Sequence, residues 1–225
     1  MTKKTNRRSG DERQNIIDAI LASQVTSSTL TRKSDIKRYL RQYFANVPFE
    51  DLVGRKPEVM ARIALDHLEF GAMRKPERAQ LRIFNPNEKE HGYASAFTFV
   101  EMVNDDMPFL VDSVAAAINR RDLSVHITVH PIISVKRDKS GKLLSVVGAE
   151  RDDASSESFI RFAVTREADE RVLKLLSKEI TSVLADVRAA VQDWGKMRQR
   201  MQETRDLLVN GPKGADPQLR TESQA

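Results

Sequence analysis

The sequence predicts an α+β protein in which an antiparallel sheet is packed by helices, with an N-terminal helical segment and a long C-terminal helix. Three observations support this prediction. Apolar residues recur at helical spacing within residues 11–75, the period changes to two between residues 94 and 165, and helical spacing returns from residue 168. The chain has 225 residues, of which 40% are hydrophobic and 31% charged, which is enough apolar material for one or two modest globular units.

Composition excludes several classes of function. Cysteine is absent, so disulfides, thiolate metal sites and cysteine nucleophiles are excluded. No apolar run approaches the roughly 18 residues that a membrane span needs. The N-terminal stretch "MTKKTNRRSGDERQN" is basic but has no apolar region behind it, unlike a secretory signal. We therefore expect a cytoplasmic protein with no membrane partner.

The first ten residues predict a flexible basic tail. Lys3, Lys4, Arg7 and Arg8 supply four of the five net positive charges, so the remainder of the chain is close to neutral. A specific nucleic-acid binder is expected to carry its basic residues on a folded face. We therefore do not expect a nucleic-acid partner, and a polyanion- or nucleic-acid-binding protein that uses this tail is the alternative function.

Residues 11–75 predict a helical segment. "DERQNIIDAILAS" and "SDIKRYLRQYFANV" each place apolar residues on one face, and Ser34 or Asp35 is the expected cap of the second helix. "KPEVMARIALDHLEFGAMRKP" predicts a third helix that begins at Pro57 and stops at Gly71. Pro76 and the loop "NPNEKEHGY" then separate this segment from the sheet.

The sheet-forming domain is expected over residues 94–190. "ASAFTFVEMVN" predicts a strand, "PFLVDSVAAAINRRD" a helix, and "SVHITVHPIISVKRD" a strand of alternating pattern. Pro131 cannot donate to a strand ladder, which predicts an edge position or a bulge. After the turn "DKSG", the stretches "KLLSVVG" and "SFIRFAVT" predict two more strands, the last with Ile160, Phe162 and Val164 as its inner set.

A single helix is expected from residue 168 to residue 208. Its apolar residues follow a spacing of four and three, which is typical of coiled-coil packing. They are Leu176, Ile180, Val183, Val187, Ala190, Trp194, Met197, Met201 and Leu208. The first half of this helix can cover the sheet, and we expect the second half to need a partner. Residues 209–225 are polar and rich in Gly and Pro, which predicts disorder.

The residues that could carry chemistry do not form a recognisable active site. His126 and His130 lie four residues apart on one strand face, or roughly 13 Å, which is too far for one metal ion. No dinucleotide, P-loop, nucleophile-elbow or kinase motif is present. Asp105 and Asp106 are better explained if one of them caps the helix entered through Pro108 than as an acid/base pair. We predict no catalytic, cofactor-binding or metal residues in this chain.

The order strand, turn, helix, strand, strand, helix resembles the ferredoxin-like βαββαβ plan of ACT domains. In that family the first strand runs into a turn of the type Asp-x-Pro-x-Leu, and "DMPFLVDSV" matches it through Asp106, Pro108 and Leu110. Longer stretches, "VNDDMPFLVDSV", "ESFIRFAVTRE" and "VLADVRAAVQDWGKM", resemble the N-terminal, ACT-like region of the large bacterial NAD-specific glutamate dehydrogenases. This resemblance covers roughly residues 15–208.

The resemblance implies a role without catalysis. Enzymes of that family oxidise L-glutamate to 2-oxoglutarate and ammonia with NAD, in a C-terminal portion that this chain does not contain. The chain therefore corresponds to a regulatory or assembly module, as a fragment or as a separate gene product, and has no cofactor of its own. The expected partners are other domains or subunits of a large dehydrogenase, a homo-oligomer, and an amino-acid effector.

ACT domains commonly bind amino acids where the first strand meets the first helix. The equivalent positions are Asn104, Asp105, Asp106, Met107, Pro108, Phe109, Val111 and Asp112. Helix N-terminal N–H groups there can hold a carboxylate, and an acidic side chain can hold an ammonium. Many ligand-binding members have glycine at the position of Phe109. A phenylalanine there would crowd a ligand or pack against another module, so the resemblance leaves both effector binding and a contact role open.

Overall fold

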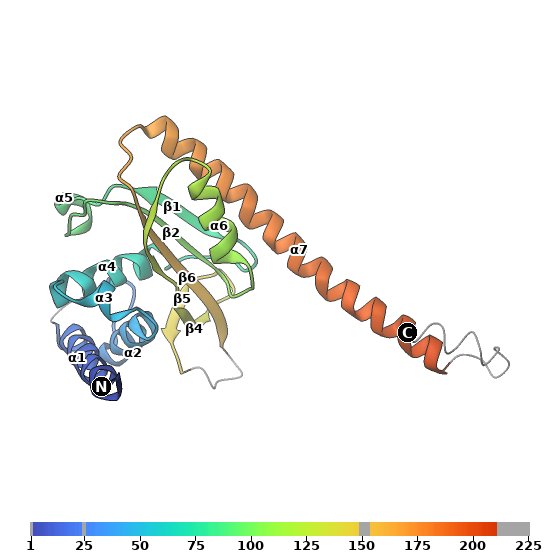
Figure 1. The fold of residues 1–225 in the computed structure, drawn as a ribbon, viewed down its shortest axis with the longest axis horizontal. Helices are drawn as coiled ribbons and strands as arrows, with labels where there is room; N and C mark the ends of the chain where they lie inside the picture. Colours follow the sequence, from blue (N-terminus) through green and yellow to red (C-terminus); the bar gives the residue numbers. More distant parts are fainter. Residues whose placement is uncertain (1, 24–25, 149–153, 211–225) are drawn as a thin grey trace. The chain divides into compact units, whose positions relative to one another are not determined.

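The computed structural model describes residues 2–23, 26–148 and 154–210. The chain divides into two compact units, Met1–Leu184 and Ala185–Ala225. The first unit contains the sheet and most of the helices (Figure 1). The last helix, α7 (Glu170–Asn210), begins in the first unit and supplies the described part of the second. Most of the predicted disordered tail lies outside the described residues, and residues 209 and 210 end α7.

Four helices precede the sheet: α1 (Thr2–Ala22), α2 (Lys33–Phe44), α3 (Phe49–Leu52) and α4 (Pro57–Phe70). The α1 helix begins at Thr2, so its bounds include most of the range predicted to be a tail. The expected cap of α2 is wrong. Arg32 occupies that position without a capping side chain, and Asp35 instead accepts from Arg38 at 3.1 Å. The predicted limits of α4 are confirmed, with Pro57 in its first turn and Gly71 at its end.

The predicted fold class is confirmed by a six-stranded antiparallel sheet. The strands are β1 (Gln80–Phe84), β2 (Thr98–Asp105), β3 (Val125–Val129), β4 (Ile132–Arg137), β5 (Leu143–Val146) and β6 (Ser155–Val164). They lie in the order β1-β2-β6-β4-β5, and β3 also pairs with β6. Two further helices are α5 (Glu88–His91) and α6 (Leu110–Asn119).

The strands β3 and β4 follow one another along the same side of β6. The β3 strand pairs with the second half of β6, from Arg161 to Val164, and β4 pairs with the first half, from Ser155 to Ser158. Pro131 lies at the break between them, where its carbonyl oxygen accepts from the Phe159 amide at 3.0 Å. The proline thus interrupts one long strand rather than terminating the sheet.

The sheet also contains a strand that the sequence pattern did not reveal. In the βαββαβ plan the outer neighbour of the first strand is the last strand of the domain. Here β1, which precedes the plan, holds that position by pairing with β2 from Gln80↔Val103 to Phe84↔Phe99. Every residue of β1 is half-buried, so its alternation of apolar and polar residues is weak.

Both faces of the central strands are covered. Val103 and Phe159, which are paired across β2 and β6, belong to one core with residues of α1, α2 and α4. Their neighbours Met102 and Ile160 point to the opposite face and are also buried. Figure 1 shows α1–α4 on one side of the sheet and α6 on the other. Arg161 and Glu101 therefore lie under helices, not in solvent.

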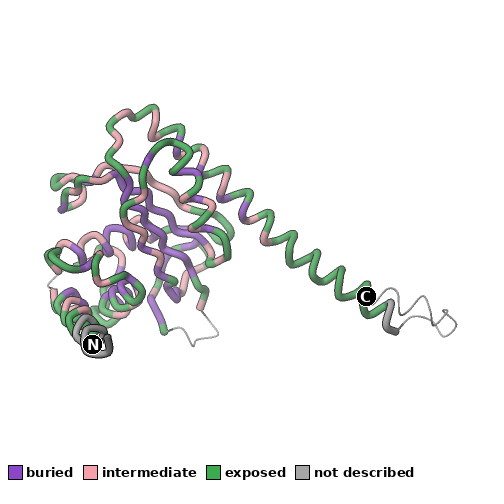
Figure 2. Tube along the Cα trace, in the orientation of Figure 1, coloured by how far each residue is buried: buried purple, intermediate pink, exposed green. Residues whose placement is uncertain are grey.

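The long helix α7 changes character along its length. Leu176, Ile180 and Leu184 are buried in its first half. From residue 192 to residue 207 its residues are exposed (Figure 2), including Trp194, Met197 and Met201. Among the helices in the described ranges, none is long and apolar enough to cross a membrane.

Candidate functional site

The predicted effector turn links the end of β2 to the start of α6. Asn104 is buried, Asp105 is half-buried, and Asp106, Pro108 and Phe109 are exposed. Of the remaining predicted residues, Met107 and Val111 are half-buried and Asp112 is exposed. The backbone of Phe109 has φ +71°, in the left-handed region, and its side chain is 63% exposed. The phenylalanine therefore does not fill the turn, and points into solvent from a conformation that favours glycine.

Phe109→Gly is expected to stabilise the monomer by about 1 kcal/mol, because a left-handed residue with a Cβ costs about that much. The mostly exposed ring offers little burial to lose. Urea denaturation at low protein concentration measures the effect. Phe109→Ala keeps the Cβ, so it should give no comparable gain, and equal gains from both variants would contradict the strain argument.

The two aspartates of the turn have structural partners. Asp105 Oδ1 accepts from Arg74 Nη2 at 2.7 Å, and Asp106 Oδ1 accepts from the Ser158 hydroxyl at 2.6 Å. No side chain caps α6, whose N-terminal position is held by Phe109. The prediction that an aspartate caps this helix is therefore wrong. Both carboxylates come before the left-handed residue and are directed toward the sheet.

A buried ionic cluster anchors the turn to the sheet. Glu157 lies at its centre and is completely buried. Its Oε1 accepts from Arg74 Nη2 and Arg137 Nε, each at 2.7 Å, and its Oε2 accepts from Arg137 Nη2 at 2.8 Å. Arg137 also donates to the carbonyl oxygens of Gly71 and Gly141, each at 2.8 Å. The cluster thus joins β4, β6, the turn and the segment after α4.

His126 in β3 and His130, which directly follows this strand, have partners within or next to the sheet. His126 Nε2 lies 3.1 Å from the Thr165 hydroxyl oxygen, and His130 Nε2 lies 3.1 Å from the Ser158 hydroxyl oxygen. Because Ser158 donates its hydrogen to Asp106, His130 donates to Ser158. A serine whose proton points to a carboxylate is not a nucleophile activated by histidine. Within the described residues, no group of three His, Asp or Glu side chains could hold a metal ion.

A second ionic cluster lies under α4. Arg82 Nη2 donates to Glu101 Oε2 and to Asp66 Oδ2, each at 2.6 Å, and Tyr93 donates to the same Asp66 oxygen at 2.8 Å. Burial raises the pKa of the Glu101 carboxyl, and the positive charges of Arg82 and Arg161 partly oppose this. The cluster ties β1 and β2 to the helical segment.

His67 of α4 is buried and uncharged. Its Nε2 donates to the Met102 carbonyl oxygen at 3.2 Å, so its Nδ1 accepts from the Tyr43 hydroxyl at 3.1 Å. Burial, followed by the nearby charges of Arg161 and Arg82, lowers the pKa of His67 well below its ordinary value. Unlike the strand histidines, this residue is part of the core between α2, α4 and the sheet.

The free energy of unfolding is expected to fall as the pH drops below about 6.5. The unfolded chain then binds a proton that folded His67 does not, so stability is lost by up to about 1.4 kcal/mol per pH unit. Urea denaturation at several pH values should show this slope. His67→Gln can keep an N–H donor for the Met102 carbonyl oxygen and should reduce the slope of the unfolding free energy against pH. A smaller slope should remain from His130, whose pKa is also lowered by burial. An unchanged slope in His67→Gln, or equal flattening in the exposed control His126→Gln, would contradict the assignment.

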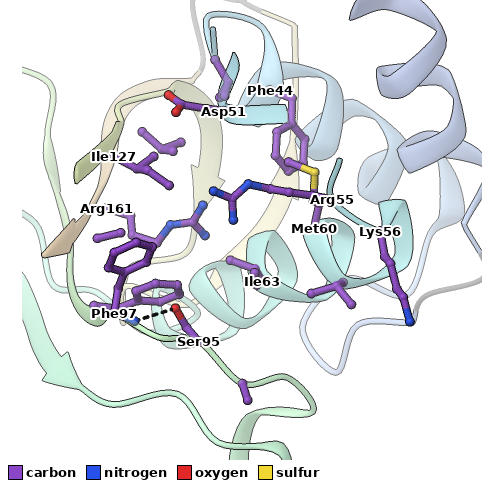
Figure 3. Close-up of a pocket in the computed structure, with 16 residues that line it drawn as sticks. Phe44, Asp51, Arg55, Lys56, Met60, Ile63, Ser95, Phe97, Ile127 and Arg161 are labelled. Carbon is purple, nitrogen blue, oxygen red and sulfur yellow. Dashed lines mark hydrogen bonds between the residues drawn. The ribbon is translucent and has the colours of Figure 1, made fainter. Parts of the chain in front are cut away.

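A cavity of about 230 Å³ lies between α2–α4 and the sheet (Figure 3). Its walls are mostly apolar and include Phe44, Met60, Ile63, Phe97, Ile127 and Val129. Four charged side chains also line it: Asp51, Arg55, Lys56 and Arg161. None of the predicted site residues contributes to it. The sequence pattern did not reveal this cavity, because it pointed to Ile160, Phe162 and Val164 as the inner set of β6 and so drew no attention to the other face. The lone cation Arg161 within the apolar stretch "SFIRFAVT" was a usable signal.

The sheet order, the left-handed turn between β2 and α6, and the helices on the sheet define an ACT-like domain. The family model described as "Glutamate dehydrogenase, ACT1 domain" matches residues 39–180. The chain belongs to this family, which confirms the resemblance found in its sequence. The match begins within α2, so it includes helices that precede the sheet.

The curated relatives to which this chain is similar include two NAD-specific glutamate dehydrogenases. An NAD-specific glutamate dehydrogenase of Halomonas elongata is 33% identical over 189 residues, which is 83% of this chain and 12% of the relative. An NAD-specific glutamate dehydrogenase of Pseudomonas aeruginosa is 30% identical over 167 residues, which is 73% of this chain and 10% of the relative. The chain therefore spans about a tenth of the length of the relatives it matches.

Proposed function

We propose that this chain is a non-catalytic regulatory and assembly module of an NAD-dependent glutamate dehydrogenase in the cytoplasm. The reaction of the assembled enzyme would be the NAD-dependent conversion of L-glutamate to 2-oxoglutarate and ammonia. The ACT1 family match over residues 39–180 carries this proposal. The partners would be other domains or subunits of the dehydrogenase, including further copies of this chain.

The geometry of the turn favours a contact role over an effector role. Phe109 is 63% exposed and held at φ +71°, a combination that costs free energy in the isolated chain. Burial of this ring against another module would offset that cost. Asp105, which could hold the ammonium of an amino acid, is already paired with Arg74. Both features support docking of the turn against a second protein surface.

The exposed part of α7 offers a second contact surface. Trp194, Met197 and Met201 are 63%, 55% and 71% exposed, which is unusual for large apolar side chains on one helix. Their coiled-coil spacing supports packing against another helix. We include this surface in the assembly role, with a dehydrogenase domain or subunit as its partner.

The effector role makes a separate prediction. Isothermal titration of the folded chain with a panel of amino acids should show saturable binding if the turn holds an effector. Asp105→Asn and Asp112→Asn should weaken that binding, and Asp122→Asn, which changes an exposed residue after α6, serves as the matched control. No binding at about 10 mM, which corresponds to a free energy weaker than about 3 kcal/mol, would remove the effector role and leave the contact role.

A further inference from the structure

We propose that the cavity between α2–α4 and the sheet binds a small apolar monocarboxylate, an aromatic or branched-chain acid, whose carboxylate is held by Arg161. This site lies apart from the turn at Asn104–Asp112, and its ligand does not depend on the proposed assembly role. Four features carry the proposal: the state of Arg161, the facing cation Arg55, the excess of positive charge, and the apolar walls.

Arg161 is a buried cation that forms no salt bridge with the described residues, although its positive charge acts on the nearby Glu101 carboxyl. Its residue is 8% exposed, and its Nη1 has no hydrogen-bond partner among the described residues. The guanidinium carbon lies 5.2 Å from the centre of the Phe99 ring and 5.6 Å from that of Tyr43. The rings stabilise the charge, but an N–H group bonds to a ring more weakly than to a carboxylate oxygen.

Glu101 on the neighbouring strand β2 does not hydrogen-bond to Arg161, and its Oε1 has no hydrogen-bond partner among the described residues. Glu101 is paired with Arg161 in the strand register, yet its Oε2 accepts from Arg82 Nε and Nη2 at 2.9 and 2.6 Å. A buried N–H left unsatisfied is costly, and more so in a charged group. By contrast, the buried guanidiniums of Arg74 and Arg137 each meet a carboxylate. Arg161 is thus equipped to receive an acceptor from the cavity.

A second guanidinium faces the same space. Figure 3 shows the guanidinium groups of Arg55 and Arg161 pointing toward one another across the cavity. The two like charges repel each other, and an anion between them offsets this repulsion because it is attracted to both. Asp51 is the one acid among the described lining residues, against the cations of Arg55, Arg161 and Lys56, although the Lys56 ammonium points away from the two guanidiniums in Figure 3. This excess of positive charge selects an anion over a cation or a neutral molecule.

The remaining walls select an apolar body for that anion. Met60, Ile63, Phe97 and Ile127 line the cavity around the two arginines. An apolar cavity of about 150 Å³ accommodates benzene. The volume of about 230 Å³ therefore fits a ring or branched chain of that size together with one carboxylate. Phosphate or acetate would leave the apolar walls unused.

Isothermal titration of the whole chain with phenylacetate tests this site. Wild-type protein is expected to bind one equivalent, and Arg161→Met should weaken binding by more than about tenfold, since a charge-assisted hydrogen bond is lost. Arg161→Lys keeps the charge and should restore part of the affinity, which a merely structural role of Arg161 would not predict. Arg55→Met tests the facing cation at an exposed position, with the exposed Arg41→Met on α2 as the matched control.

Several results would overturn the proposal. They are no heat of binding at about 10 mM phenylacetate, 2-phenylethanol binding as tightly as phenylacetate, or equal affinities of the Arg55→Met and Arg41→Met variants for phenylacetate. Thermal melts show whether Arg161→Met is folded, and the Arg55→Met comparison decides the question if it is not. Failure of self-association would contradict the proposed contact role without affecting this site.

Discussion

Glu157→Gln is expected to lower the free energy of unfolding by about 3–5 kcal/mol, the usual cost of breaking a buried ion pair from one side. The substitution conserves volume but removes the negative charge between Arg74 and Arg137, whose side chains are 3% and 8% exposed. It also places an amide N–H group against guanidinium N–H groups at one of the two acceptor positions. Urea denaturation followed by circular dichroism measures the loss.

The matched control is Glu179→Gln. Glu179 also meets two arginines, Arg120 and Arg121, but their side chains are 57% and 38% exposed. A solvent-exposed pair contributes about 0–1 kcal/mol, so this variant should remain close to wild type. Similar losses in the two glutamate variants would show that burial of the cluster does not set its contribution.

Gly141→Ala is expected to be comparably severe, with a loss of about 3 kcal/mol or more. Gly141 ends the turn between β4 and β5 with φ +90°. A Cβ built there would lie 2.3 Å from the carbonyl oxygen of Arg74 and 2.7 Å from its carbonyl carbon. The Gly141 carbonyl oxygen also accepts from the Arg74 amide at 3.0 Å. Neither backbone segment can therefore move away without breaking this hydrogen bond, which aligns the ionic cluster. The midpoint of urea denaturation reports the effect.

Gly54→Ala separates the two causes of that loss. Gly54 has φ +76°, but a Cβ there meets nothing within 4 Å. The conformational cost alone is about 1 kcal/mol, so Gly54→Ala should lose about that much and Gly141→Ala clearly more. If the two variants lost the same amount, the close approach of Arg74 would carry no energetic weight.

Local patterns were sufficient to predict most of the elements. The changes of apolar period placed β2, α6, β6 and α7 correctly, because this period is a property of residues that are close together in the sequence. The β1 strand was missed because its residues are uniformly half-buried and because its partner, β2, is remote in sequence. The cap of α6 was misjudged because the aspartates find long-range partners in Arg74 and Ser158.

The candidate sites show the same limit. The turn at residues 104–112 was identified from its motif, and the position of Phe109 was recognised as one where glycine is usual, in agreement with its positive φ. The cavity depends on helices α2–α4 covering the sheet face that carries Arg161, which is opposite to the predicted inner set of Ile160, Phe162 and Val164. Arg161 and Arg55 are separated by about a hundred residues, so no local pattern could bring them together.

The central claim is that the turn at Phe109 serves assembly, and sedimentation velocity tests it most directly. The wild-type chain is predicted to self-associate as its concentration rises, whereas Phe109→Gly, although more stable as a monomer, should self-associate more weakly over the same range. A wild-type chain that stays monomeric, or a Phe109→Gly variant that associates equally well, would contradict the claim.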